Sequence, residues 1–244
     1  MITQYRFSSR VAHFEKLFAA KWGMNSYMNC QEPCVFIGLY DDTDFNIIRK
    51  HSGFKVLWQT GTPDVKRNNE YIRALAPDTV FINRFYCHFP QGANVKNVHI
   101  AIKDYSEFTP NIMGDKIYIY LGAGSSRNLY GYRQAEELKK LVKYDILYGL
   151  AGKNIDYKKE YYDKCFANLN LSLSGRCGFT TAFELGYMGR MSLTTSNAQY
   201  PMLRRGNMVD MINEESHKIG TIQPSMMDGF QITDDRWKKI SFWQ

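Results

Sequence analysis

A cation, small residues and a carboxylate follow one another closely between residues 174 and 184 of the chain. The loop 174–178 reads Ser-Gly-Arg-Cys-Gly, so that Arg176 and Gly178 stand just before a predicted helix. Backbone N–H groups at a helix start favour a phosphate, and the arginine adds positive charge. Glu184 lies far enough into the helix to accept two hydroxyls of a ribose. This combination predicts a nucleotide-sugar site; the alternative is an ordinary strand-to-helix turn with a solvated glutamate.

The elements that must position these groups alternate between strand and helix patterns. Apolar and polar residues alternate from Leu169 to Leu173, as in a short strand. Apolar residues then recur at helical spacing until Gly189, and Met191 to Thr195 reads as the next strand. Three residues begin the helix and supply capping hydroxyls: Phe179, Thr180 and Thr181. The order strand, small-residue loop, helix, strand is typical of an α/β sheet.

A second small-residue turn follows the apolar run 116–121. It reads Gly-Ala-Gly-Ser-Ser-Arg-Asn-Leu-Tyr-Gly over 122–131 and leads into a helix pattern. A dinucleotide site is disfavoured because Arg127 stands where a third glycine is expected and no acid ends the strand 146–149. The guanidinium of Arg127 instead suits a diphosphate, since its planar fork grips two phosphate oxygens.

These segments resemble the donor-binding half of GT-B glycosyltransferases, particularly the retaining family 4 enzymes. The residues that match the family's order of strand end, turn, helix glutamate and following glycine–cation pair are Ser174, Gly178, Phe179, Glu184, Gly189 and Arg190. The turn with Gly122, Arg127 and Tyr130 resembles the opening of the same half. The resemblance implies that Arg127 and Arg176 stabilise the donor diphosphate and that Glu184 holds the ribose. The family usually has another glutamate eight residues before this one, where the chain carries Arg176, so the role of that carboxylate is not carried over.

The first half of the chain supplies candidates for acceptor and catalytic groups. The turn from Trp58 to Asp64 is similar to the W-x-G-T-D turn of small viral and bacterial GT-B enzymes, which makes Asp64 a candidate for positioning acceptor or sugar. Asp64 fits a helix cap equally well. Retaining enzymes of this class often place a histidine beside the transferred sugar, and His88 and His51 are the candidates here.

Metal chemistry has one short sequence signal. Asp42 to Asp44 forms a D-x-D, which holds a metal in GT-A glycosyltransferases. It lies between the strand pattern 34–40 and the helix pattern 45–50, and capping of that helix explains it better. The five cysteines are scattered and odd in number, which favours reduced thiols. We therefore expect no metal and no bound cofactor, with a UDP- or GDP-sugar as co-substrate.

Composition limits the class of protein. The chain has 244 residues, 44% of them apolar, and a formal net charge of +7. It can bury sizeable cores, and the positive excess favours anionic partners such as nucleotide phosphates, nucleic acid or an acidic membrane surface. No apolar run approaches the ~18 residues that span a bilayer, and the N-terminus lacks the apolar segment of a signal peptide. We expect a soluble cytoplasmic protein without a transmembrane segment, in the host cell if the protein is viral.

Two α/β halves are expected. An N-terminal, acceptor-side half spans 1–105, and a nucleotide-sugar-binding half spans 116–225. Between them, 103–115 loses periodicity and reads as a linker, and 226–244 is a tail that crosses back to the first half. The expected fold class is α/β of the GT-B type, with two Rossmann-like halves facing across a cleft.

The expected activity is metal-independent transfer of a sugar to an acceptor hydroxyl, with a retaining outcome implied by the resemblance. One acceptor is a hydroxymethylated base in phage DNA, because basic side chains of the first half would follow a phosphate backbone: Lys55, Lys66, Arg67, Arg73 and Arg84. The other is a glycan or lipid-linked acceptor at an anionic membrane. A non-enzymatic basic nucleic-acid-binding module and a metal-dependent GT-A enzyme are the remaining alternatives.

Overall fold

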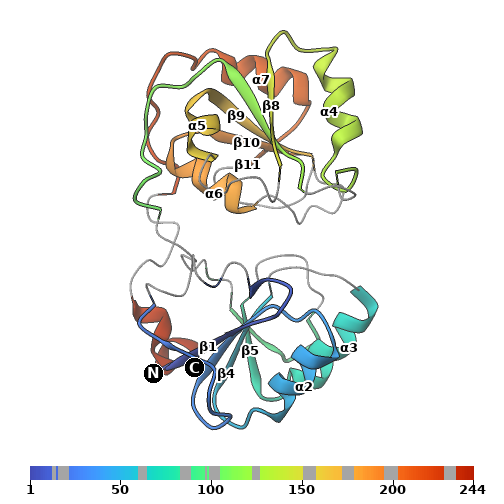
Figure 1. The fold of residues 1–244 in the computed structure, drawn as a ribbon, viewed down its shortest axis with the longest axis vertical. Helices are drawn as coiled ribbons and strands as arrows, with labels where there is room; N and C mark the ends of the chain where they lie inside the picture. The colour runs from blue at the N-terminus through green and yellow to red at the C-terminus, as the bar shows by residue number, and fades with distance from the viewer. Residues whose placement is uncertain are drawn as a thin grey trace. The chain divides into compact units, whose positions relative to one another are not determined.

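The computed structural model describes twelve stretches of the chain, and all structural statements below concern these: 1–12, 15, 22–59, 65–82, 89–96, 98, 105–122, 127–150, 158–171, 179–194, 203–227 and 235–244. The chain divides into two compact units, Met1–Asp104 with Gly229–Gln244 (unit 1) and Tyr105–Asp228 (unit 2). Each unit has its own parallel sheet with helices against it, which confirms the α/β fold class (Figure 1).

Unit 1 is built on a six-stranded parallel sheet with the order β2-β1-β3-β4-β5-β6. Its strands are β1 (Gln4–Phe7), β2 (Asn25–Ser26), β3 (Cys34–Ile37), β4 (Lys55–Trp58), β5 (Thr79–Ile82) and β6 (Asn94–Lys96). Two helices, α2 (Asp42–Lys50) and α3 (Val65–Leu75), share a buried apolar cluster with one face of the sheet. At one edge of the sheet, β6 pairs with β5 from Asn94 to Lys96.

The opposite face of this sheet is covered by aromatic side chains and by the end of the chain. Trp22 packs against Trp58 of β4 and edge-on against Trp237, which lies in the 3-10 helix η5 (Asp235–Lys238). The Ile2 amide donates to the Lys238 carbonyl, and the Lys238 ammonium donates to the Trp22 carbonyl. Together with α8 (Ile240–Trp243), this C-terminal segment is therefore a core element of unit 1.

The first strand, β1, is absent from the sequence-based prediction. Its sequence, Gln-Tyr-Arg-Phe, has two polar residues and gives no apolar run. The structure buries Gln4 because its side-chain amide bonds the backbone of residues 28, 29 and 32. Such long-range partners are invisible in a local pattern, so the strand was overlooked.

Unit 2 is built on a five-stranded parallel sheet with the order β11-β10-β9-β7-β8. Its strands are β7 (Lys116–Tyr120), β8 (Ile146–Gly149), β9 (Cys165–Asn170), β10 (Met191–Thr194) and β11 (Leu203–Arg205). Its helices are α4 (Tyr132–Lys139), α5 (Lys158–Asp163), α6 (Phe179–Tyr187) and α7 (Met208–Ser216). The predicted strand 169–173 overlaps only the end of β9, which begins at Cys165 and pairs with β7 through Leu169 and with β10 through Asn170; residues 172–173 lie outside the described part of the chain.

The two faces of the unit 2 sheet differ in chemistry. Ile117, Ile119 and Leu169 belong to an apolar cluster with residues of α4 and α7. Alternate residues point to the other face, where Asn168 donates from Nδ2 to Ser192 Oγ at 2.8 Å. Tyr118 is the register partner of Asn168, so a row of polar side chains crosses three strands on the face nearest α5 and α6. A buried polar layer of this kind is stable only when its members are hydrogen-bonded to one another.

Residues 105–113, predicted as a linker, are packed into unit 2. Tyr105, Phe108 and Met113 are buried, and the Tyr105 ring stacks on Tyr187 at 4.8 Å between centroids. Arg190, which directly precedes β10, bonds this segment to the sheet: its guanidinium donates to the carbonyls of Cys165, Met188 and Ile112. The apolar residues in the stretch are too widely spaced to show helical or strand periodicity, which explains why the pattern indicated a linker.

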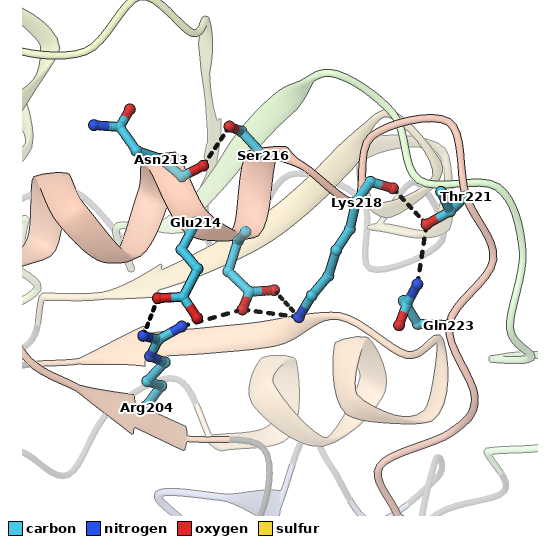
Figure 2. A network of polar contacts seen from close by, with 8 residues as sticks. Arg204, Asn213, Glu214, Ser216, Lys218, Thr221 and Gln223 are labelled. Atoms are coloured by element: carbon cyan, nitrogen blue, oxygen red, sulfur yellow. Dashed lines mark hydrogen bonds and ion pairs between the residues drawn. The ribbon is translucent and has the colours of Figure 1, made fainter.

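A polar network ties α7 to β11 and to the following turn (Figure 2). Glu215 is 1% exposed and accepts from Lys218 at 2.8 Å, with Arg204 at 3.6 Å. Arg204 also pairs with Glu214, and the Lys218 carbonyl accepts from the Thr221 hydroxyl. Glu215 is therefore a buried, paired carboxylate on the apolar side of the sheet.

In the described part of the chain, no helix is both long and apolar enough to cross a membrane.

Candidate functional site

The two segments singled out in the sequence follow neighbouring strands. Strand β7 pairs with both β8 and β9, so the order of the sheet reverses between β7 and β9. In open parallel sheets, ligands bind at such a reversal, outside the carboxyl ends of the strands. The turn beginning at Gly122 follows β7, and the loop leading to α6 follows β9. The candidate site therefore lies at the carboxyl edge of β7 and β9.

The turn after β7 presents a cation to solvent. Arg127 is exposed, and its backbone carbonyl accepts from the amides of Tyr130 and Tyr132 at 3.1 Å each. Residues 127–132 are thus held by backbone bonds that do not involve the guanidinium group. Gly122 has φ +65°, and the Tyr130 ring lies so close that a Cβ on residue 122 would be 2.3 Å from it. A side chain on residue 122 would therefore displace this ring.

A second glycine, Gly131, lies where the start of α4 approaches the end of β9. Gly131 is the N-cap of α4 with φ 82° and no side-chain capping bond. A Cβ on this residue would lie 2.4 Å from the carbonyl oxygen of Leu171 and 2.5 Å from its Cβ. Leu171 directly follows β9, so the backbone at the start of α4 packs against the end of β9. The turn after β7 and the exit of β9 are therefore in contact.

The first turns of α6 carry two of the predicted donor-binding residues in a buried setting. Thr180 is half-buried, whereas Thr181 is 3% exposed and Glu184 is fully buried. The Tyr162 hydroxyl donates to Glu184 Oε2 at 2.5 Å. Burial, followed by the charge of Glu184, raises the pKa of Tyr162 well above its usual value, so that hydroxyl keeps its proton and remains a donor. This burial contradicts the alternative in which Glu184 is solvated.

This burial restricts what Glu184 can do. A ribose must reach a carboxylate with no exposed surface whose Oε2 already accepts from Tyr162. A direct ribose contact therefore requires that the start of α6 open locally, and it stays a prediction. Phe179 begins α6 as expected. The remaining site candidates lie outside the described residues: Asp64, His88, Arg176 and Gly178.

Sequence reasoning missed polar residues at the same edge. Asn170 and Thr194 are the last residues of β9 and β10, are register partners, and are 7% and 0% exposed. The Thr194 hydroxyl donates to the Asn170 carbonyl at 3.1 Å. Tyr162 was also missed. The signal was present in the alternation of Asn168 and Asn170 within a buried strand, since polar residues facing the same side of a central strand need buried partners.

His51, considered as a sugar-side histidine, lies at the wrong edge of its sheet. It is the C-cap of α2 and precedes β4, which places it near the amino ends of the strands. It is 1% exposed, its ring contacts Phe36 edge-on at 5.2 Å, and its Nδ1 is 3.4 Å from the Tyr27 hydroxyl. His51 is therefore a packed core residue of unit 1.

The environment of His51 predicts a pH-dependent stability. Burial, and then the charge of Lys55, lower its pKa below 6.5, so the unfolded state binds the proton more tightly. The contribution to stability is complete above the unfolded pKa and is lost as the pH falls through the folded pKa, by about 1.4 kcal/mol per pKa unit of difference. Hydrogen exchange of β3 and β4 amides between pH 7.5 and 5 should show this loss in the wild type and not in His51→Gln. His217→Gln, at an exposed position in unit 2, is the control and should leave the loss unchanged. The account is contradicted if His51→Gln shows the same loss as the wild type, or if His217→Gln removes it.

Both acids of the D-x-D and the Asp41 that precedes them have structural partners. The Asp42 carboxylate accepts from the Tyr71 hydroxyl. Asp41 is the N-cap of α2 and accepts from the Asp44 amide at 3.0 Å. Asp44 is 1% exposed, and its carboxylate accepts from Arg6, from the Ser8 hydroxyl and from the Tyr40 amide. Capping and a buried hydrogen-bond network therefore explain these residues. Among the residues that the structure describes, no group of three His, Cys, Asp or Glu side chains is arranged to hold a metal ion.

One of the basic residues assigned to a DNA backbone is not available. Lys55 is 3% exposed, and its ammonium pairs with Asp78 at 2.5 Å, so it cannot reach a phosphate on the surface. Arg73 is exposed in the last turn of α3. The pattern failed at Lys55 because a lysine that begins a central strand reads as surface charge unless its ion-pair partner is known.

The comparison with known proteins adds no family. The sequence matches no protein-family model and no curated protein. What bears on function is the geometry of unit 2. The sheet order reverses between β7 and β9; the segment with Arg127 follows β7, and the start of α6 follows β9.

Proposed function

We propose that the protein is a glycosyltransferase of the GT-B type that transfers a sugar from a nucleotide-sugar to an acceptor hydroxyl. The observation that carries this proposal is the placement of the Gly122–Tyr130 turn and the start of α6 after β7 and β9, at the reversal of sheet order. Two segments with the residue types of a diphosphate site follow β7 and β9, the strands at whose carboxyl ends a parallel sheet with this order binds nucleotides. The contact between Gly131 and Leu171 supports the same site.

In this proposal the donor diphosphate lies at the carboxyl edge of unit 2. The exposed Arg127 and the backbone N–H groups at the start of α6 stabilise the charge that develops on the leaving diphosphate. Arg176, Asp64 and His88 keep their predicted roles at the diphosphate, the acceptor and the sugar. Holding donor and acceptor in one orientation supplies the entropic part of the catalysis, and exclusion of water prevents hydrolysis of the donor.

Nucleotide binding is the direct test. UDP, GDP and their sugars, each in a concentration series with the full chain, should include one that raises the thermal midpoint, because a ligand at 100 times its Kd stabilises by about 2.7 kcal/mol. Exchange protection should appear at 127–132 and in the first turns of α6. Stabilisation confined to unit 1, or no stabilisation by any nucleoside diphosphate, would contradict the proposed function.

The ribose contact of Glu184 is tested separately. Glu184→Ala should raise the donor KM by about tenfold or more, or abolish transfer. If the contact is direct, the wild type should bind a 2′,3′-dideoxy nucleoside diphosphate more weakly than the parent nucleotide. The Glu184→Gln variant should bind the two ligands equally well. Glu215→Gln, which alters another buried carboxylate of unit 2, is the matched control. Equal loss from the dideoxy ligand in wild type and Glu184→Gln would exclude the direct contact.

The acceptor is proposed to be a hydroxymethylated base in DNA. The net charge of +7 favours an anionic acceptor, although Lys55 does not contribute to a binding surface. A base in a duplex must be flipped out to reach the donor. Duplex binding that weakens steeply with salt supports this acceptor. Binding to anionic liposomes without duplex binding would instead favour a lipid-linked or glycan acceptor.

A further inference from the structure

Tyr162 is the centre of a buried cluster of hydroxyl groups beneath the candidate site. It is a residue of α5 with no exposed surface. Its hydroxyl donates to Glu184 Oε2 at 2.5 Å and accepts from the Thr181 hydroxyl. A tyrosine hydroxyl has one proton and two lone pairs. Because the proton goes to the carboxylate, the oxygen is left to accept from the Thr181 hydroxyl.

The partners of Tyr162 belong to the elements that frame the site. Thr181 and Glu184 are three residues apart on α6, so they lie on one side of the helix and both bond to the Tyr162 hydroxyl. Tyr118 lies in β7, two residues before the strand ends, and its ring meets the Tyr162 ring edge-on at 4.9 Å. Tyr118 is itself fixed, because a Cβ on Gly149 of β8 would lie 1.8 Å from its hydroxyl oxygen. The cluster therefore joins the start of α6 to β7 and β8.

We infer that Tyr162 is a positioning residue of the donor site, which acts through Glu184 and Thr181 by holding the first turns of α6 at a fixed place beside β7. The inference rests on the proposed function. Glu184 has no exposed surface, so without a local opening of α6 it cannot touch a ligand. It can then affect ligand binding only by holding the groups to which it is hydrogen-bonded. The N–H groups that meet the diphosphate belong to the same turns, and a displacement of about 1 Å is enough to weaken such contacts.

Tyr162→Phe tests this, because it removes one hydroxyl and keeps the ring packing. The matched control is Tyr148→Phe, which removes another tyrosine–glutamate bond of unit 2, from Tyr148 to Glu136 at 2.7 Å. Tyr162→Phe should raise the Kd of the nucleoside diphosphate that binds the wild type by about tenfold, as expected for one lost bond to a charged group. It should raise the donor KM similarly while kcat at saturating donor stays within about twofold. Tyr148→Phe should change neither.

A double-mutant cycle separates positioning from general loss of stability. In a Glu184→Ala background, which removes the acceptor of the Tyr162 hydroxyl, Tyr162→Phe should weaken binding by clearly less than in the wild type, whereas in a Glu215→Gln background its full effect should persist. Additive effects with Glu184→Ala, or a Tyr162→Phe Kd equal to that of Tyr148→Phe, would overturn the inference and leave the proposed function standing. Absence of nucleotide binding by the wild type would overturn both.

A variant of a neighbouring residue covers the case in which Tyr162→Phe does not fold. Tyr118→Phe removes the hydroxyl of the ring that meets Tyr162 edge-on and retains the bond from Tyr162 to Glu184. It should raise the same Kd in the same direction and by less than tenfold. If Tyr162→Phe is unfolded and Tyr118→Phe binds the nucleotide as the wild type does, the inference is wrong.

Discussion

Arg127→Gln is expected to lower kcat/KM for sugar transfer by about 100- to 1000-fold, the usual cost of removing one donor that stabilises developing negative charge. The leaving diphosphate gains charge in the transition state, and Arg127 is the exposed cation of the turn that follows β7. The fold should tolerate the change, because the turn is held by the Arg127 carbonyl and not by its side chain. Stability should therefore stay within about 0.5 kcal/mol of the wild type.

Two further variants sharpen this expectation. Arg127→Lys keeps the charge and loses the planar fork, so a loss between those of wild type and Arg127→Gln is expected. Lys139→Gln removes a cation from the exposed last turn of α4, at the other end of that helix, and should have no effect on transfer. Single-turnover rates with a radiolabelled nucleotide-sugar measure all three. If Arg127→Gln and Lys139→Gln transfer at the same rate, Arg127 does not serve the diphosphate.

Gly131→Ala is expected to destabilise unit 2 by about 2–5 kcal/mol. A left-handed conformation costs an alanine about 1–2 kcal/mol, and forcing an extra atom into a packed site costs about 1–3 kcal/mol more. The added Cβ would lie 2.4 Å from a backbone oxygen of Leu171, which cannot rotate away as a side chain does. The start of α4 must then move away from the end of β9, so donor binding should weaken as well.

Gly220 provides the control for the conformational part of this cost. It has φ +79°, close to that of Gly131, and a Cβ on it would meet no atom within 4 Å. Gly220→Ala should therefore show only the cost of the left-handed conformation, about 1–2 kcal/mol. Hydrogen exchange of β7 and β9 amides isolates unit 2 in this two-unit chain. Equal costs for the two variants would refute the close approach of residue 131 to Leu171.

The sequence predicted the local elements wherever one short pattern was sufficient. The strand 146–149 has the expected bounds, and the apolar run 116–121 contains strand β7 (Lys116–Tyr120). Capping at Asp41 followed from the preference of acids for helix starts. Errors occurred where a polar residue has a distant partner: Gln4 in β1 and Lys55 in β4 are both buried by contacts with residues more than twenty positions away.

The candidate site shows the same division. From the sequence alone, the glycine, arginine and threonine types predict that the segments 122–131 and 174–184 have the chemistry of a diphosphate site. Only the tertiary structure decides that these segments follow adjacent strands, because strand order depends on which faces can be buried together and not on the order in the chain. The structure alone also decides that Glu184 is buried against Tyr162, since a glutamate at that helical position reads as solvated until the α5 side chain that covers it is known.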